Sequence, residues 1–474
     1  MTFNTKIYLA RRYPMFAAKT YGERRNRLKK QIKSGLIVLF GNEESPMNYT
    51  DNTYHFRQDS TFLYFFGLDS PGLAAVIDID ENRETILGNE LTIDDIVWMG
   101  SQPSLAEKSR QVGVANTAPA TNLSEIIATA RTKKRQIHFL PPYRPENKIK
   151  LFELLGIVPS KLSESASVEL IRAVVAQRNF KTAEEIKEIE LAADISVDMH
   201  TAAIRMGKPG MKEREIAAEV QRVAQAAGGQ IAFPIILSIN GQTLHNHYHG
   251  NTLKSGDMVL CDFGAETELH YCADLSSTFP VDPKFTARQK EIYAISLEAH
   301  NAALAALRPG KKFKEVHFAA CRKIAEGLKG LGLMKGNVDD ALEAGAHAMF
   351  FPCGTGHMMG LDVHDMEDIG EIYVGYGEQT RSTQFGLKSL RLAKELQPGF
   401  VLTIEPGIYF IPELIDKWRA EKRFNDFLDY AKLESYKTFS GIRNEENVLI
   451  TQDGYRLLGK KKPKSIEEVE ALRG

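Results

Sequence analysis

Two acidic residues stand at or beside the ends of apolar runs, where charged side chains are uncommon. Asp262 ends the run MVLCD, and Asp274 follows in HYCADLSSTF, with the turn-like segment GAETE between them. Two strands joined in this way form a hairpin, which can hold both carboxylates side by side. Because adjacent like charges repel and raise a pKa unless a cation neutralises them, the pair predicts a cation site.

A second acidic pair and two histidines lie further along the chain. Glu405 lies in VLTIEPGIYF and Glu445 in GIRNEENVLIT, and the glycine-rich segment FFPCGTGHMMGLDVHD carries His357 and His364. Four carboxylates and one imidazole suit two divalent ions with bridging carboxylates, and Mn²⁺, Co²⁺ or Zn²⁺ are each chemically acceptable. We interpret four other acidic residues of these segments as ordinary solvated residues: Asp365, Glu367, Asp368 and Glu446.

An internal repeat would supply both acidic pairs. The pattern P-G-x-K-x-x-E-[IV] at residues 209–216 recurs at residues 309–316. The run GDMVLCDFG (256–264) resembles PGFVLTIEPG (398–407), and in each an apolar strand ends in a carboxylate two residues before a glycine. The two matches together favour a duplicated domain in which each half offers acidic strands.

The elements that position these residues fall into two predicted domains. In residues 1–175, helical stretches alternate with β-rich apolar runs, which predicts an α/β domain. The apolar runs lie at 35–40, 62–68, 72–79 and 136–140. Residues 169–180 predict a connecting helix, and residues 176–474 form the second domain, of α+β class. Capping boxes at Thr182–Glu185 and Thr286–Gln289 begin its long helices.

Composition excludes several classes of protein. The 474 residues carry 60 Lys and Arg against 61 Asp and Glu, so the formal net charge of −1 argues against a nucleic-acid partner and against attraction to anionic lipid. No apolar run approaches the roughly 18 residues of a membrane helix, and the N-terminus lacks the apolar core of a signal peptide. Four scattered cysteines without a C-x-x-C pair argue against disulfides and against thiolate zinc sites, and they fit a reducing compartment, so we expect a cytoplasmic enzyme.

At the acidic and histidine segments, the sequence resembles the pita-bread metallopeptidases, in the branch of Xaa-Pro aminopeptidases (aminopeptidase P) and prolidases. The matching stretches are LHNHYHG, MVLCDFG, ADLSSTFP, GTGHMMGLDVHD, TIEPGIYF and GIRNEENVLIT. FRQDSTFLYFFGLDSPG and LTIDDIVWMG resemble the N-terminal domain of the creatinase and aminopeptidase P type. The resemblance implies that the second domain is a pita-bread catalytic domain with an internal pseudo-twofold.

The resemblance also implies roles for individual residues. The ligands of a dinuclear metal centre would be Asp262, Asp274, His357, Glu405 and Glu445. Mn²⁺ would be the expected metal, with Co²⁺ or Zn²⁺ as alternatives. Asp274 and Glu445 would bridge the ions, and Glu405 would also be the general acid and base. His245 and His364 would hold the substrate or its oxyanion. The substrates would be proline-containing peptides, cleaved before proline.

Two departures from the family pattern affect the expected substrate contacts. Cys353 stands where the family commonly has a histidine, four residues before the ligand His357. Three histidines compete for one substrate-binding position; counting back from Asp262 favours His245, with His247 second and His249 third.

The closest alternative activity is that of a prolidase, which cleaves dipeptides. A prolidase must recognise a free carboxylate, for which arginine is the natural partner. Arg391 matches the carboxylate-binding arginine of that group, whereas Arg443 is shared by both groups and does not discriminate. We favour the aminopeptidase. More remote alternatives are a non-catalytic peptide-binding module and a metal-free, creatinase-like hydrolase. The family also leads us to expect a homodimer or homotetramer.

Overall fold

The computed structural model describes residues 15–474, which divide into two compact units. The first unit runs to Arg178 and includes Met366–Tyr373; the second comprises Asn179–Asp365 and Val374–Gly474. The predicted domain boundary after residue 175 stays a prediction. The N-terminal segment, for which we expect no signal peptide, lies largely outside the described residues. Within residues 15–474, no helix is both long and apolar enough to cross a membrane.

The first unit is built on a five-stranded sheet with the order β4-β3-β2-β1-β5. Its strands are β1 Leu36–Phe40, β2 Ala74–Asp78, β3 Arg83–Leu87, β4 Asn116–Ala118 and β5 Ile137–His138. β1, β2 and β3 pair antiparallel, whereas β5 is parallel to β1 and β4 is parallel to β3. Leu123 and Ile127 of helix α5 pack on apolar side chains of the sheet, including Val38 and Val76.

One predicted strand of this unit is a helix. Residues 62–68 fall mostly in α2 (Ser60–Phe66), in which every side chain is buried. Asp59 caps its first turn by accepting a hydrogen bond from the backbone N–H of Phe62 at 2.8 Å, and Gly67 ends it with a φ of 61°. Because a fully buried run shows no helical or strand periodicity, the capping residues at its two ends were the usable signal.

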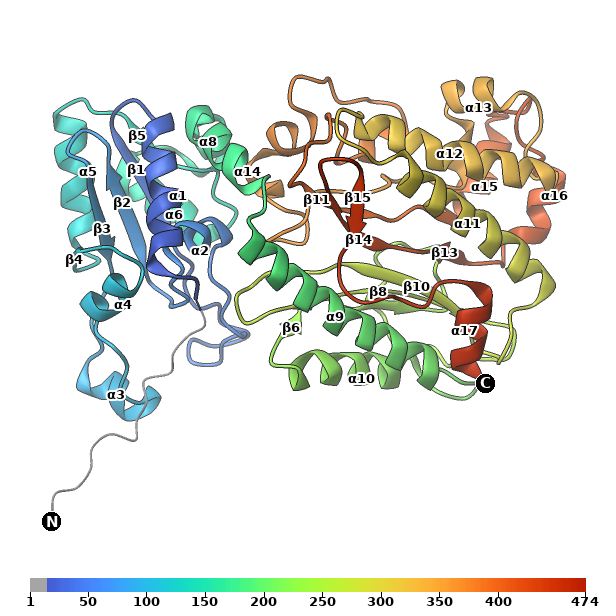
Figure 1. The fold of residues 1–474 in the computed structure, drawn as a ribbon, viewed down its shortest axis with the longest axis horizontal. Coiled ribbons are helices and arrows are strands. Elements are labelled where there is room, and N and C mark those ends of the chain that lie inside the picture. Colours follow the sequence, from blue (N-terminus) through green and yellow to red (C-terminus); the bar gives the residue numbers. More distant parts are fainter. Residues whose placement is uncertain (1–14) are drawn as a thin grey trace, which may run out of the picture. The chain divides into compact units, whose positions relative to one another are not determined.

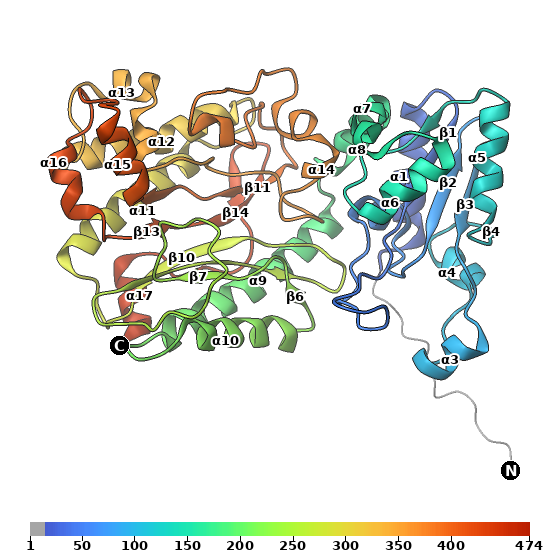
Figure 2. The same cartoon turned by 180° about the vertical axis from the view of Figure 1, so that it is seen from behind.

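The second unit contains two pairs of adjacent helices, which Figures 1 and 2 show side by side in both views. The first pair is α9 (Ala183–Met206) with α10 (Glu213–Ala226), and the second is α11 (Ala287–Ala306) with α12 (Phe313–Gly330). Both predicted capping boxes are present, at the beginning of α9 and of α11.

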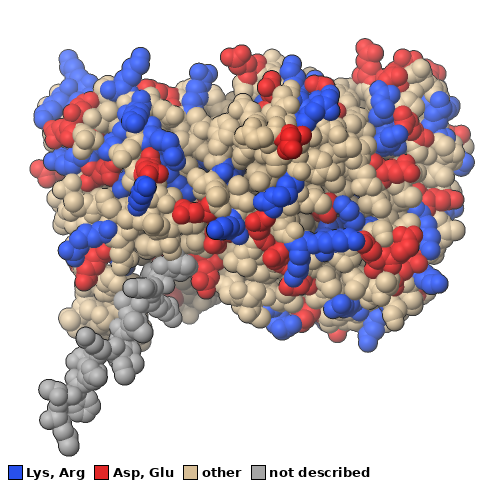
Figure 3. Space-filling model, viewed as in Figure 1, with Lys and Arg blue, Asp and Glu red and all other residues tan. Residues whose placement is uncertain are grey.

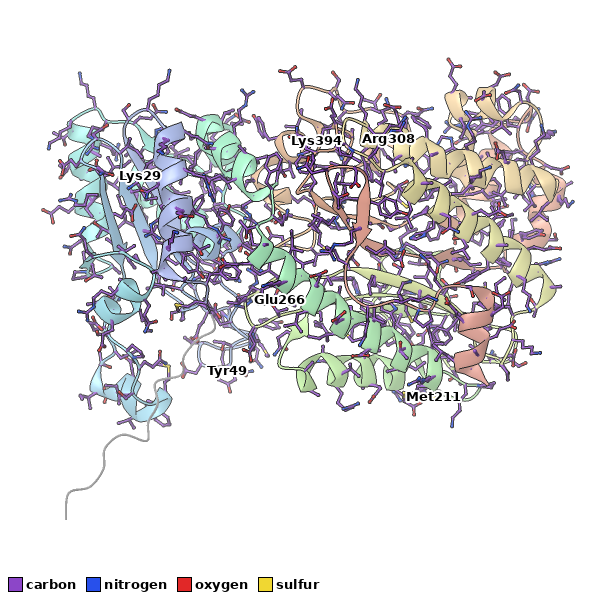
Figure 4. The ribbon with its side chains drawn as sticks, viewed as in Figure 1. Lys29, Tyr49, Met211, Glu266, Arg308 and Lys394 are labelled. Atoms are coloured by element: carbon purple, nitrogen blue, oxygen red, sulfur yellow. The ribbon has the colours of Figure 1, made fainter. Side chains whose placement is uncertain are left out.

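The turns after α9 and α11 make matching hydrogen bonds, 100 residues apart. Gly210 N–H donates to the Leu253 carbonyl at 2.9 Å, and Gly310 N–H donates to the Leu396 carbonyl at 2.9 Å. Figure 4 labels Met211 and Arg308, which lie in these two turns. The repeat seen in the sequence is therefore a repeat of backbone geometry.

Each half also supplies strands that carry acidic residues at or beside their ends. One sheet has the order β10-β8-β7 and another β11-β14-β15, while β12 pairs with β13 and β6 with β9. The strands are β6 Gln230–Ile231, β7 Ile236–Ser238, β8 Met258–Phe263, β9 Ala265–Glu266, β10 Leu275–Pro280, β11 Val401–Ile404, β12 Gly407–Tyr409, β13 Gly441–Arg443, β14 Glu446–Ile450 and β15 Tyr455–Leu457.

The hairpin of β8 and β10 requires a glycine where its two backbones approach most closely. β8 and β10 are antiparallel, with Asp262 opposite Ser276. A Cβ added at Gly264 would lie 1.8 Å from the carbonyl oxygen of Ala273, next to Asp274. This close approach brings the chain segments of the two acidic residues together.

Further helices complete the two units. Those of the first unit are α1 Ala18–Gln31, α3 Ile93–Met99, α4 Leu105–Gln111, α5 Asn122–Thr132, α6 Pro145–Leu155, α7 Leu162–Ser165, α8 Val168–Arg178 and α14 Glu367–Glu371. Those of the second are α13 Val338–Ala344, η2 Ala346–Met349, α15 Pro412–Ala420, α16 Tyr430–Leu433 and α17 Ile466–Arg473. On the face drawn in Figure 3, basic and acidic side chains are interspersed, as the balanced composition leads one to expect.

Candidate metal centre

The structure brings together all five residues that the sequence suggests as metal ligands. Asp262 lies in β8 and Asp274 immediately before β10; Glu405 follows β11, and Glu445 lies between β13 and β14. His357 reaches them from the glycine-rich segment, where its backbone exchanges hydrogen bonds with Thr403 of β11, Thr403 N–H donating to the His357 carbonyl at 3.0 Å.

The ligand atoms form overlapping groups. One atom from each of Asp262, Asp274 and Glu445 lies within 4.8 Å of the others, and the same holds for His357, Glu405 and Glu445. A third group of this kind joins Asp274, His357 and His364. Asp274, Glu445 and His357 each belong to two groups, so the three groups form one continuous cluster.

Several ligand atoms of the cluster lie close together in the interior. His357 Nδ1 lies 3.0 Å from the Met358 carbonyl, to which it donates, so its Nε2 presents a lone pair. That Nε2 lies 3.4 Å from Asp274 Oδ2 and 3.4 Å from Glu405 Oε1. Asp274 Oδ1 and Glu445 Oε1 are buried without a hydrogen-bond partner among the described residues. A lone pair surrounded by carboxylate oxygens fits divalent cations.

Arg443 supplies one positive charge to the cluster. Its guanidinium donates to Asp262 through Nη2, to the Tyr409 hydroxyl at 2.9 Å and to Ser276 Oγ at 2.9 Å. Burial opposes the charge, but Asp262 and its neighbours raise the pKa of Arg443 well above its ordinary value. Ser276 in turn donates its hydroxyl to Glu445 Oε2 at 2.7 Å. Arg443 therefore pairs with Asp262 and is connected through Ser276 to Glu445.

The remaining negative charge is not compensated by side chains. Burial, followed by repulsion from Asp262, raises the pKa of Asp274 well above its ordinary value. Burial, followed by repulsion from Asp274, does the same for the pKa of Glu445. Burial also raises the pKa of Glu405, against the attraction of His357. Without cations, the cluster therefore retains protons that divalent ions would displace.

A cavity of about 510 Å³ opens onto the cluster. The Glu405 side chain is 21% exposed, against 12% for Asp262 and 8% for Asp274, so it is the most exposed of the three carboxylates that line the cavity. The cavity lining includes the sequence-predicted residues His245, His247, His364, Arg391 and Arg443.

The histidines around the cavity differ in what they contact. The ring of His364 lies 4.1 Å from that of His357. Burial lowers the pKa of His245, which keeps its ring neutral and able to donate one N–H. His249 instead lies with Nε2 3.0 Å from the Ile235 carbonyl and is absent from the cavity lining. Of the three candidates, His245 and His247 face the cavity.

Cys353 also lines the cavity, at the position where the family commonly has histidine. Burial, followed by the charge of Glu405, raises the pKa of its thiol to about 12. The side chain hydrogen-bonds with Tyr409, which also contacts Arg443. The residue is therefore a neutral thiol at neutral pH and cannot act as a cationic donor.

The interpretation of Asp365 and Glu446 as solvated residues is wrong. Asp365 accepts a hydrogen bond from Lys181 Nζ at 2.9 Å, and both side chains are almost completely buried. Glu446 is buried and pairs with Lys464 Nζ at 2.6 Å. Lys181 is far from Asp365 in the sequence, and Lys464 lies well beyond the strand that begins with Glu446. No local pattern in the sequence therefore indicates either ion pair. Both ion pairs flank predicted ligand segments and anchor them.

Two family models match this chain. Residues 187–452 match metallopeptidase family M24, and residues 21–138 match the aminopeptidase P N-terminal domain. Human Xaa-Pro dipeptidase is 33% identical over 459 residues, covering 94% of this chain and 90% of that protein. A protein of Aspergillus niger named probable Xaa-Pro aminopeptidase is 31% identical over 475 residues, covering 98% of each.

Solved structures show the same similarity over the length of the chain. A variant of Escherichia coli aminopeptidase P in complex with substrate superposes with a TM-score of 0.79 and 27% identity, covering 97% of this chain and 98% of that one. The aminopeptidase of Pseudomonas aeruginosa gives a TM-score of 0.78 and 26% identity with the same coverage. The fold is therefore an aminopeptidase P N-terminal domain followed by a pita-bread domain, as the sequence predicts.

We expect Mn²⁺ to stabilise the protein more as pH rises. Because the carboxyl pKa values of Asp274 and Glu445 are raised by folding, the metal-free folded chain binds more protons than the unfolded chain. Its stability therefore falls as pH rises above the ordinary carboxyl pKa. Mn²⁺ replaces those protons, and at about 100 times Kd it adds about 2.7 kcal/mol per site. Calorimetry should give a larger Mn²⁺-induced rise in Tm at pH about 8 than at about 5.5.

Two glutamate variants, one at a proposed ligand and one as its control, test whether the Mn²⁺-induced rise in Tm comes from this cluster. Glu445→Gln should lose most of the Mn²⁺-induced rise in Tm, whereas Glu413→Gln, at an exposed position of α15, should keep it. A rise that is equal at the two pH values, or that survives Glu445→Gln, would contradict the assignment of the cluster as a metal centre.

Proposed function

The chain belongs to metallopeptidase family M24, and from this membership we propose that it is a metal-dependent Xaa-Pro aminopeptidase. Such an enzyme hydrolyses the peptide bond between an N-terminal residue and a following proline. The observation that carries the proposal is the buried cluster of four carboxylates and one imidazole at the base of a cavity. Proline-containing peptides are the proposed substrates.

The proposed centre holds two divalent ions. Asp274 and Glu445 would contact both ions, Asp262 would bind one, and His357 with Glu405 would bind the other. Carboxylate-rich ligation favours Mn²⁺, with Co²⁺ or Zn²⁺ as alternatives. All five positions carry side chains able to bind metal, which argues against a non-catalytic peptide-binding module and against a metal-free, creatinase-like hydrolase.

When bound, the ions supply Lewis acidity that activates water at neutral pH and polarises the scissile carbonyl. The side chains handle the protons. Glu405, the most exposed of the carboxylates that line the cavity, would accept the proton of the attacking water and deliver it to the departing proline nitrogen. Thr403 Oγ1, 3.3 Å from Glu405 Oε1, can hold the carboxylate in this orientation.

The proposed contacts to substrate come from the cavity wall. Neutral His245 and the nearby His364 would donate hydrogen bonds to the oxyanion or to the bound peptide. Arg443 lines the cavity and would act indirectly, by holding the Asp262 carboxylate in place through its hydrogen bond. Because proline nitrogen carries no hydrogen, recognition of the scissile bond cannot use the amide N–H on which other peptidases depend.

A prolidase is the second candidate, and one observation favours it. Arg391 lines the cavity, where a guanidinium could bind the free carboxylate of an Xaa-Pro dipeptide in bidentate fashion. The similarity to human Xaa-Pro dipeptidase points the same way. Coverage of 98% of both chains in the match to the Aspergillus niger protein, together with the aminopeptidase P structures, supports the aminopeptidase.

Two further features belong to the proposal. We place the enzyme in the cytoplasm, because its four cysteines, all among the described residues, form no disulfide and suit a reducing compartment. We also propose a homodimer or homotetramer, which sedimentation of the full chain would distinguish from a monomer.

Glu405→Gln should abolish most of the peptidase activity. The amide cannot carry the proton to the leaving nitrogen, so we expect kcat on Ala-Pro-Ala with Mn²⁺ to fall by about 10²–10⁴-fold. The rate of hydrolysis is measured as the alanine released over time, which is quantified by chromatography. Glu413→Gln changes the same chemical group at an exposed position and should leave the rate unchanged. If Glu405→Gln retained more than a tenth of the activity, Glu405 would not be the general acid and base.

Comparison of Ala-Pro-Ala with Ala-Pro separates the two candidate functions. For an aminopeptidase, the wild-type enzyme should have the higher kcat/KM on Ala-Pro-Ala. Arg391→Ala should then lower kcat/KM for Ala-Pro by about tenfold to a hundredfold and change kcat/KM for the tripeptide little. The expected loss corresponds to one charge-assisted hydrogen bond between the guanidinium and the dipeptide carboxylate. Clear preference of the wild-type enzyme for Ala-Pro would make the chain a prolidase.

A further inference from the structure

A second cluster of metal-binding side chains lies apart from the five carboxylate and histidine ligands. His317 and Cys321 stand one turn apart on α12, and His347 lies in the short helix η2. Their exposed fractions are 1%, 0% and 1%, and one ligand atom from each lies within 4.8 Å of the other two. Two nitrogens and one sulfur therefore meet in the interior without a carboxylate among them.

In this cluster an outer hydrogen bond engages one nitrogen of each histidine, while the other nitrogen of His317 faces the Cys321 thiol and that of His347 has no partner among the described residues. His317 Nδ1 lies 2.8 Å from Thr355 Oγ1, which can accept its proton, and His317 Nε2 lies 3.3 Å from Cys321 Sγ. The His347 ring hydrogen-bonds with the backbone carbonyl of Ala341, whereas its buried Nδ1 has no partner among the described residues. An outer hydrogen bond that fixes the tautomer and leaves the other nitrogen bare is the usual arrangement of a metal-binding histidine.

Charge in this cluster is low until a cation enters. Burial lowers the pKa of His317 to about 3 and that of His347 to about 4, so both rings are neutral with lone pairs available. Burial also raises the pKa of the Cys321 thiol well above its ordinary value. A bound divalent cation would displace the thiol proton, as metals do at cysteine ligands.

We propose that His317 Nε2, Cys321 Sγ and His347 Nδ1 bind a single Zn²⁺ ion, distinct from the dinuclear centre. Zinc binds nitrogen at about 2.0–2.1 Å and thiolate sulfur at about 2.3 Å, so two such ligands in tetrahedral geometry lie about 3.5 Å apart. The 3.3 Å between His317 Nε2 and Cys321 Sγ is close to that spacing. The imidazole and thiolate set selects zinc over Mn²⁺, which the carboxylate-rich centre favours.

The zinc site would support the segment that carries the catalytic ligand His357. Thr355, which contacts His317, is completely buried, and its carbonyl accepts a hydrogen bond from Glu405 N–H at 2.8 Å. The ion would thus hold α12, η2 and the backbone of the glycine-rich segment together. His317, Cys321 and His347 act as positioning residues in this arrangement and touch no substrate.

Cobalt substitution tests the site on the wild-type chain. Co²⁺ bound to a thiolate gives an intense sulfur-to-metal charge-transfer absorption in the near ultraviolet, which carboxylate and imidazole ligands do not give. We expect this absorption when the metal-free full-length protein is titrated with Co²⁺, and its loss when Zn²⁺ is added. Metal analysis after dialysis against Zn²⁺ should give one ion per chain more in the wild type than in Cys321→Ser.

Cys353→Ser is the matched control, because Cys353 is the cysteine that lines the cavity of the dinuclear centre. The absorption should persist in Cys353→Ser and disappear in Cys321→Ser. The proposal is overturned if wild-type protein shows no thiolate absorption with Co²⁺, or if only Cys353→Ser removes it. Neither readout depends on peptidase activity, so the zinc site and the proposed function can fail separately.

Discussion

The catalytic unit depends on gathering four carboxylates in an interior where like charges repel. One compensating charge is built in, since Arg443 donates to Asp262 and is connected through Ser276 to Glu445. The pKa directions of Asp274 and Glu445 show that side chains alone leave the cluster short of positive charge. Divalent cations would remove that deficit, so the proposed metal binding and acid–base chemistry follow from one electrostatic constraint.

The duplicated architecture is what makes such a cluster possible. Each half presents strands whose ends carry acidic residues, and matching backbone hydrogen bonds after α9 and α11 give the halves the same local geometry. The glycine-rich segment lies along β11 and adds the imidazole of His357 between carboxylates from both halves. Asp274 comes from one half and Glu445 from the other, which is consistent with the proposal that both would contact two ions.

The sequence was informative where a single residue breaks a strong local pattern. Asp262 at the end of an apolar strand and the capping residue Thr182 could be read directly, and the structure has them in those positions. It was misleading where burial removes periodicity, as in α2, and where a partner is distant, as for Asp365 with Lys181. The cluster around Cys321 was missed because its third member, His347, approaches only through tertiary packing. Sequence patterns predict local conformation well, but buried ion pairs depend on contacts between segments that are distant in the sequence.

Anomalous scattering from crystals of the full chain grown with Mn²⁺ tests the central claim most directly. We expect two anomalous peaks among Asp262, Asp274, His357, Glu405 and Glu445, with oxygen atoms of Asp274 and Glu445 at coordination distance from both. No peak at these residues, or a single peak that neither Asp274 nor Glu445 contacts, would contradict it.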